Sequence, residues 1–160
     1  MSILISFISI AVLTAVDQVI KFVVERYLQP IGSVEFINGF IGWNYVRNTG
    51  AAFGSFSQST TLLSIMTGIV ILAGIVLIAT KKIKSKFYLT CAVMVISGGL
   101  GNLIDRVLKG YVVDFIEVQF TDFAVFNFAD ILVTVGAIAI MIYVIVDMFR
   151  ERKKTGEKHE

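Results

Sequence analysis

Two long stretches of the sequence contain no Asp, Glu, Lys or Arg. One runs over 33 residues from Asn48 to Thr80, and the other over 18 residues from Phe87 to Ile104. An apolar helix of about 17 to 25 residues crosses the roughly 30 Å hydrocarbon core of a bilayer, so both stretches can hold a membrane span. Only 16% of all residues are charged, against about 25% in a typical soluble domain. We therefore expect a polytopic membrane protein, and not a soluble, disordered or nucleic-acid-binding chain.

Four apolar segments are long enough to span a membrane. They cover residues 3–24, 61–80, 87–104 and 126–149. Five glycines in the second and third segments are expected to let helices approach closely: Gly68, Gly74, Gly98, Gly99 and Gly101. The predicted fold is an all-α membrane protein in one domain, residues 1–160, with a small extracytoplasmic β-sheet and loop region.

The distribution of basic residues predicts the orientation. Four lysines occupy the six-residue loop Lys81–Lys86, and the tail 150–160 is also basic. Short Lys- and Arg-rich segments next to spans stay on the cytoplasmic side. Both termini are therefore expected to be cytoplasmic, while Glu25–Thr60 and Asp105–Val125 face outward. Because these basic clusters directly follow apolar spans, they indicate topology and no nucleic-acid partner.

The two outer segments contain patterns typical of strands. Asn38-Gly39 interrupts an aromatic and β-branched run from Glu35 to Val46, and an Asn-Gly pair in this setting predicts a hairpin. Tyr111–Phe120 also has the pattern of an extended chain. We expect a small sheet that lies on the membrane surface.

The rare residue types restrict the chemistry. The chain has one cysteine, Cys91, and one histidine, His159 in the charged tail. No intrachain disulfide, histidine-based zinc site or Ser-His arrangement can be built from them. We expect no metal and no cofactor, so any reaction must use carboxylates, amides, hydroxyls, Lys or Arg.

Ionisable residues at membrane depth are costly and are therefore candidates for function. Asp17 and Lys21 are four residues apart on one face of the first predicted span. They can form a structural ion pair with Lys21 snorkelling outward, or they can contact a substrate.

A polar motif precedes the second span. In Val46–Gly54, Arg47, Asn48 and Thr49 are followed by Gly50 and other small residues. The motif lacks the Gly-Lys-Ser/Thr ending of a phosphate-binding loop. Small residues allow a bound peptide to approach the backbone closely, although a plain turn into the span fits the pattern equally well.

Three aspartates are predicted to converge at the outer interface: Asp105, Asp114 and Asp130. Asn102 precedes Asp105 by three residues, and Asn127 precedes Asp130 by three, so each pair is expected to share a helix face. Arg106 follows Asp105 directly.

Two of these carboxylates are suited to acid–base chemistry. Asp105 is expected to be held ionised by the adjacent Arg106 in a structural role. Asp114 has no cation nearby in the sequence, and Asp130 lies inside an apolar segment. Two carboxylates close together titrate as a pair. The ionised member can then activate a water for attack on an amide while the protonated member donates to the carbonyl oxygen.

Taken together, these motifs resemble the lipoprotein signal peptidases, the signal peptidase II family of bacterial membrane aspartic proteases. Five matching motifs occur in the family's order along the chain: Asp17–Lys21, Arg47–Gly54, Gly101–Arg106, Val112–Phe115 and Phe126–Asp130. The order of five motifs is more specific than any one of them.

The resemblance implies an endopeptidase that removes the signal peptide of a diacylglyceryl-prolipoprotein before the lipidated cysteine. It implies that Asp114 and Asp130 are catalytic. Further residues match polar positions that line or support the family's site: Asn48, Asn102, Arg106, Asn127, Asp17 and Lys21. We add Gly50 and Asp105 to this supporting set. The expected partners are the prolipoprotein and membrane lipid, and the enzyme is expected to act as a monomer in the bacterial cell membrane with its site at the outer face.

Two other classes of function remain open from the residues alone. A small carrier or proton relay could use Asp17, Asp105, Asp114 and Asp130, although the sequence shows no repeated halves. A purely structural four-helix scaffold would not need Asn and Asp residues gathered at one interface.

Overall fold

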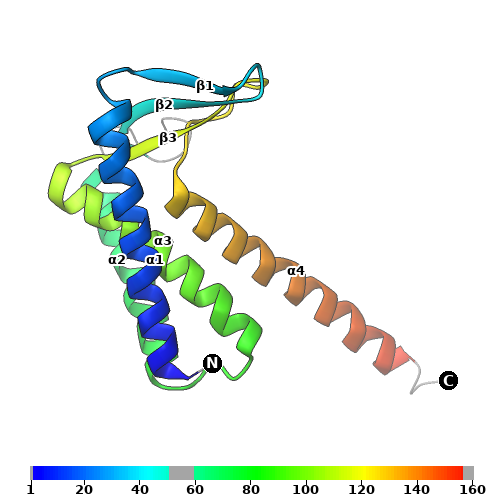
Figure 1. Cartoon of the computed structure of the whole chain (residues 1–160). Coiled ribbons are helices and arrows are strands. Elements are labelled where there is room, and N and C mark those ends of the chain that lie inside the picture. The colour runs from blue at the N-terminus through cyan, green and yellow to red at the C-terminus, as the bar shows by residue number, and fades with distance from the viewer. Residues whose placement is uncertain (1, 51–59, 157–160) are drawn as a thin grey trace.

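Four long helices and a small sheet make up the fold (Figure 1). The computed structural model describes residues 2–50 and 60–156. The helices are α1 (Ile3–Val23), α2 (Thr60–Ala79), α3 (Lys86–Lys109) and α4 (Phe128–Gly156), and a π-helical segment, η1 (Val24–Leu28), continues α1. Within the described ranges, four helical segments are long and apolar enough to cross a membrane. The predicted four-helix architecture is confirmed.

The helix boundaries differ from the predicted ones at the polar ends. The first helical run continues to Leu28 and α3 continues to Lys109, because charged residues end an apolar segment without ending a helix. Gly110 ends α3 in a left-handed conformation, φ 79°, which glycine adopts without strain. The α4 helix begins two residues later than predicted and extends into the basic tail. Residues 51–54 of the polar motif, and His159, lie outside the described residues.

The sheet is antiparallel with strand order β1-β2-β3. Its strands are β1 (Ser33–Ile37), β2 (Ile41–Asn48) and β3 (Val112–Val118). Gly39 takes a positive φ of 69° in the turn between β1 and β2, and the Phe40 N–H donates to the Ile37 carbonyl at 2.8 Å. The predicted hairpin and the third strand are therefore confirmed, the third with ends two or fewer residues inside the predicted ones.

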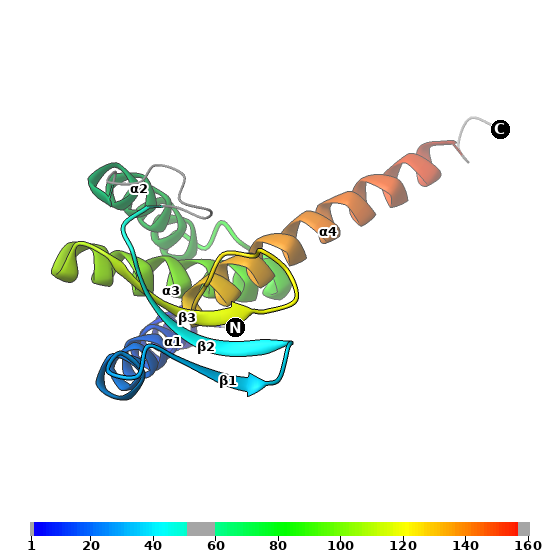
Figure 2. The same cartoon turned by 90° about the horizontal axis from the view of Figure 1, so that it is seen from above.

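The helix α3 is the central element and packs against the other three helices (Figure 2). The sheet lies at one end of the helices, while the N-terminal end of α1 and the C-terminal end of α4 lie away from it (Figure 1). The β2–β3 pairing and the start of α4 are therefore brought to the same end of the molecule as the C-terminal ends of α1 and α3.

One face of α1 shows how the chain separates polar and apolar groups. Its buried residues are Ser6, Ile10, Thr14, Asp17 and Lys21, spaced three or four apart. Apolar side chains on the other faces are exposed, for example Leu4 at 69% and Val19 at 61%. An apolar exterior around a polar interior is what a hydrocarbon solvent requires.

Close helix packing depends on two glycines of α3. A Cβ on Gly98 would overlap the Ala129 carbonyl of α4, and a Cβ on Gly101 would overlap the Asp17 carboxylate of α1. Gly74 of α2 is also packed, since its Cβ would lie 2.8 Å from Ile96 Cδ1, whereas a Cβ on Gly68 would meet nothing within 4 Å. A Cβ on Gly99 would lie 3.3 Å from Ile71 Cγ1 of α2. The packing prediction is confirmed for Gly74, Gly98, Gly99 and Gly101 and is wrong for Gly68.

Replacing Gly98 by alanine is expected to destabilise the protein by about 1–3 kcal/mol, the usual cost of overpacking. The added methyl group must push α4 away from α3 because the overlapping atom belongs to the backbone. Thermal unfolding in detergent should show a lower midpoint for Gly98→Ala. Gly68→Ala is the matched control and should not lower it; equal midpoints for the two variants would contradict this packing.

Candidate active site

Asp114 and Asp130 reach one site from different elements. Asp114 is the third residue of β3, and Asp130 lies in the first turn of α4. The β2–β3 register pairs Val46 with Asp114, which places Asn48 diagonally across from Asp114 on the same face of the sheet. The predicted convergence of these two carboxylates is therefore seen in the fold.

Asn127 joins the two aspartates through both of its polar groups. It precedes α4 as the N-cap residue: its Oδ1 accepts from the Asp130 N–H at 3.0 Å, and Asp130 Oδ2 accepts from the Asn127 N–H at 3.0 Å. This reciprocal pattern is a capping box. Asn127 Nδ2 also donates to Asp114 Oδ1 at 2.7 Å. The prediction that Asn127 shares a helix face with Asp130 is wrong, because the helix begins one residue after it.

Asn102 of α3 supports the same pair from below the sheet. Its Nδ2 donates to Asp130 Oδ1 at 2.8 Å. Its Oδ1 accepts from Asn127 Nδ2 at 3.1 Å and from Lys21 Nζ at 2.9 Å. These partners distinguish the oxygen from the nitrogen of the Asn102 amide, so that its NH₂ group is directed toward Asp130.

The end of β2 supplies further contacts. Asn48 Nδ2 donates to Asp114 Oδ2 at 2.8 Å, and Asn48 Oδ1 accepts from the Gly50 N–H at 2.9 Å. Arg106 Nη2 donates to the Gly50 carbonyl at 3.3 Å. Arg106 Nε is buried and has no hydrogen-bond acceptor among the described residues. The predicted supporting residues Asn48, Gly50 and Arg106 are therefore brought to the site.

A cavity of about 410 Å³ opens at this point. Its polar lining consists of Asn48, Asn102, Arg106, Asp114, Asp130 and Thr134, and the rest of the lining is apolar. A second, apolar groove of about 690 Å³ runs along α2, α3 and α4 and reaches Asn102, Arg106 and Asp130. A polar centre at the end of a long apolar groove suits a substrate that is mostly apolar with one polar reacting group.

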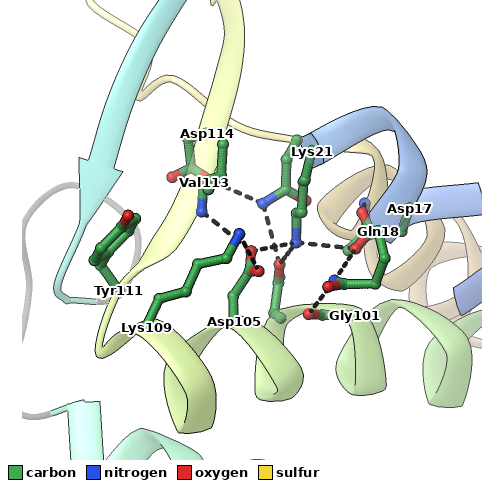
Figure 3. A network of polar contacts seen from close by, with 12 residues as sticks. Asp17, Gln18, Lys21, Gly101, Asp105, Lys109, Tyr111, Val113 and Asp114 are labelled. Carbon is green, nitrogen blue, oxygen red and sulfur yellow. Dashed lines mark hydrogen bonds and ion pairs between the residues drawn. The ribbon is translucent and has the colours of Figure 1, made fainter. Parts of the chain in front are cut away.

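A buried ion bridge connects α1 to α3 close to Asp114 (Figure 3). Lys21 Nζ lies 3.0 Å from Asp17 Oδ2 and 3.1 Å from Asp105 Oδ2, and all three side chains are fully buried. The structural ion pair expected of Asp17 and Lys21 is confirmed. The expected snorkelling of Lys21 is wrong, because the ammonium group has two carboxylates and an amide oxygen as partners inside the protein.

Asp105 has different partners from those predicted. Its carboxylate is paired with Lys21 and, at 3.1 Å, with Lys109 one turn further along α3. Adjacent helical residues point in different directions, whereas residues four apart share a face, so Arg106 turns instead toward Gly50. The predicted pairing of Asp105 with Arg106 is wrong, and its structural role stays a prediction.

Sequence reasoning missed three residues around this bridge. Lys109 Nζ also binds Glu25 Oε2 at 2.8 Å, and Gln18 Nε2 donates to Asp17 and to the Gly101 carbonyl at 3.2 and 3.1 Å. The i, i+4 spacing of Asp105 and Lys109 could have revealed the ion pair between these two residues. No local pattern links Glu25 or Gln18 to residues more than 80 positions away.

Asp114 has an environment suited to proton transfer. Burial and the neighbouring Asp130 carboxylate raise the pKa of Asp114 from 3.8 to about 6, while hydrogen bonds from Asn48 and Asn127 and the charge of Lys21 act against this shift. Two neighbouring carboxyl groups of this kind can share one proton near neutral pH. Such a pair can both accept a proton from water and donate one to a carbonyl oxygen.

Known proteins are similar to this chain along most of its length. The family model described as signal peptidase (SPase) II matches residues 9–146. A lipoprotein signal peptidase of Caldanaerobacter subterraneus is 44% identical over 131 residues, which cover 81% of this chain and 88% of the relative. One from Clostridium acetobutylicum is 39% identical over 151 residues, which cover 92% and 96%.

Solved structures of bacterial membrane enzymes have a similar fold. A bacterial membrane enzyme structure obtained by the in meso method is similar with a TM-score of 0.81 at 35% identity, over 89% of this chain and 88% of that one. A second such structure has a TM-score of 0.76 at 35% identity, over 87% and 91%. The similarity therefore extends from the sequence to the arrangement of the helices and the sheet.

The raised pKa of Asp114 predicts a pH-dependent stability. Between the unfolded pKa near 3.8 and the folded value of about 6, the folded state binds more protons than the unfolded state. The free energy of unfolding therefore falls as the pH rises through this window, by up to about 3 kcal/mol in total, and levels off above it. The melting temperature of the wild type should therefore rise from pH 8 to pH 5 relative to that of Asp114→Asn. Asp122→Asn, at an exposed position, should keep the wild-type dependence; parallel curves for wild type and Asp114→Asn would contradict the shift.

Proposed function

The chain belongs to the signal peptidase II family, and we propose that Asp114 and Asp130 are its catalytic pair. Its function is the removal of signal peptides from lipoproteins, which makes it a protease of a bacterial membrane. This assignment favours a peptidase over a carrier or a structural scaffold. The catalytic type, the substrate position and the orientation in the membrane are our proposals.

The hydrogen bonds of Asn127 are the observation that carries the proposal. One asparagine caps the helix that bears Asp130 and donates directly to Asp114. The two carboxyl groups line the same 410 Å³ cavity together with Asn48, Asn102 and Arg106. This geometry supports an aspartic dyad, in which the amides orient both carboxyl groups without neutralising either of them.

In the proposed reaction the dyad carries one proton. The ionised carboxylate takes a proton from a water molecule while the water oxygen attacks the scissile carbonyl carbon. The protonated carboxyl group donates its proton to the carbonyl oxygen. The carboxyl that took the water proton then donates it to the departing nitrogen as the C–N bond breaks, and the other carboxylate takes a proton from a hydroxyl of the tetrahedral intermediate, which leaves one proton on the dyad. Arg106, whose Nε has no acceptor among the described residues, is placed at the cavity to hold a substrate carbonyl.

The apolar groove supports a lipidated substrate. We propose that cleavage occurs directly before a diacylglyceryl-modified cysteine, with the signal helix and acyl chains along α2, α3 and α4. Burial of apolar surface at about 25 cal/mol per Å² supplies the binding free energy. The polar groups at Asn102, Arg106 and Asp130 then have only to position the scissile amide, which is the part of binding that accelerates the reaction.

We further propose that the dyad lies at the outer membrane face and that both termini are cytoplasmic. The lysine loop between α2 and α3 lies at the end of the helices away from the sheet (Figure 1). Short basic loops remain in the cytoplasm, so the opposite end, with the sheet and Asp114, faces outward.

Asp114→Asn and Asp130→Asn are each expected to abolish cleavage of a diacylglyceryl-prolipoprotein by the purified protein. Asparagine keeps the shape of the aspartate side chain, but its amide group can neither take a proton from water as a base nor donate one as an acid. The cleavage rate of each variant should fall below the detection limit, while circular dichroism should show that the variant is folded. Asp122→Asn, in the exposed segment after β3, is the matched control; wild-type turnover in either dyad variant would exclude the proposed pair.

Metal removal is expected to leave the reaction unchanged. Within residues 2–50 and 60–156, no cluster of His, Cys, Asp and Glu is arranged to hold a metal ion, and the dyad chemistry requires none. Cleavage rates should agree before and after dialysis against EDTA. A loss of rate that zinc or manganese restores would argue for a metal-dependent hydrolase.

A further inference from the structure

Two buried aspartates outside the dyad have closely parallel contacts. Asp17 Oδ1 accepts from the N–H of Ala129 at 3.1 Å, and Ala129 directly precedes Asp130. Asp105 Oδ2 accepts from the N–H of Val113 at 3.2 Å, and Val113 directly precedes Asp114. Each of these carboxylates therefore holds the backbone one residue before a proposed catalytic residue.

Lys21 connects the two anchors. Its Nζ lies 3.0 Å from Asp17 and 3.1 Å from Asp105 (Figure 3). The same ammonium group donates to Asn102 Oδ1 at 2.9 Å, which fixes the Asn102 amide with its donor on Asp130. The start of α4 and the strand β3 are thus attached to one point on α1.

We propose that Asp17, Lys21 and Asp105 form a positioning bridge that sets the separation of the Asp114 and Asp130 carboxyl groups. The proposal rests on the proposed function, since it presupposes that these two aspartates are the dyad. None of the three bridge residues lines either the 410 Å³ cavity or the apolar groove. They act through the backbone and through Asn102, and so are positioning residues.

The surrounding packing limits the size of a bridge at this point. Gly98 and Gly101 bring α3 into contact with Ala129 and with the Asp17 carboxylate, so α1, α3 and the start of α4 meet with no room for a larger linker. The chain of alternating charges continues outward from Asp105 through Lys109 to Glu25. That outer pair is partly exposed and binds no N–H next to the dyad.

The test compares the kinetics of Asp17→Asn and Asp105→Asn with wild type on a diacylglyceryl-prolipoprotein. Both variants keep the shape and an acceptor oxygen but weaken the hold on Lys21. The value of kcat is expected to fall about tenfold or more, since small displacements of reacting groups are costly. KM should stay within about threefold, because the residues lie outside the cavity and the groove.

The pH profile of kcat separates positioning from a merely structural role. The dyad should give two apparent pKa values whose separation depends on the distance between the carboxyl groups. The charged groups next to the dyad are Lys21 from α1, which acts on Asp114, and Arg106 from α3, which acts on both Asp114 and Asp130. Asp17 and Asp105 lie behind them as the partners of Lys21. Loss of one nearby negative charge lowers both apparent pKa values of the dyad by a similar amount, which shifts the whole profile to lower pH. A looser bridge also lets the carboxyl groups move apart, which weakens their coupling and brings the two apparent pKa values closer together. For Asp17→Asn and Asp105→Asn we expect a narrower pH profile of kcat than that of wild type.

Glu25→Gln is the matched control, because it removes a charge from the outer end of the same chain of ion pairs. Its kcat and profile width should equal those of wild type. Lys21→Arg provides a second variant that keeps the positive charge but changes the span between the two carboxylates. Circular dichroism shows whether the larger side chain is tolerated, and kcat of the folded variant should fall. Wild-type kcat and profile width in any folded variant of Asp17, Lys21 or Asp105 would overturn the bridge.

Failure of the bridge and failure of the dyad give different results. If Asp114→Asn or Asp130→Asn still cleaves at the wild-type rate, the proposed catalytic pair is wrong and the bridge has nothing to position. If those variants are inactive and the folded bridge variants keep wild-type kcat and profile width, only the bridge proposal is wrong.

Discussion

The buried ammonium group of Lys21 is the interaction on which the rest of the site depends. It touches Asp17, Asp105 and Asn102, and these three residues in turn touch α4, β3 and Asp130. A buried ion pair contributes little net stability compared with apolar packing, because its charges must be stripped of water. Its effect here is on the arrangement of side chains, because Lys21 Nζ orients the amide of Asn102 and connects the carboxylates of Asp17 and Asp105.

Three asparagines connect this bridge and the end of β2 to the proposed dyad. An asparagine amide has a donor end and an acceptor end, so it can bind one carboxylate while its oxygen is held by another donor. Asn48 uses the Gly50 N–H for that purpose, and Asn102 uses Lys21 and Asn127. Neutral donors orient the carboxyl groups without the strong stabilisation of the anion that an arginine would bring. The raised pKa of Asp114 is compatible with that arrangement.

Much of this protein could be predicted from its sequence, for physical reasons that differ between elements. The absence of charge from Asn48 to Thr80 and from Phe87 to Ile104 predicts spans, because hydrocarbon excludes ions whatever the tertiary structure. Asn38-Gly39 predicts the hairpin because the turn needs a positive φ, which Gly39 adopts. Asp114 stood out because no cation lies near it in the sequence, and Asp130 because it lies inside an apolar segment. The boundary at Asn127 was missed because a helix N-cap depends on one reciprocal hydrogen-bond pair, and not on hydropathy.

The sequence by itself determined the four spans, the strands, and the restriction of chemistry to carboxylates and amides, since these follow from composition and local pattern. Only the tertiary structure decided the partners. Lys21 turned inward because Asp105, 84 positions away, offers it a carboxylate, and Asp105 turned from its neighbour Arg106 because the two point away from each other on α3. Local sequence carries no information on contacts that form only when α1, α3 and α4 pack together, and those contacts give each charge near the dyad its position.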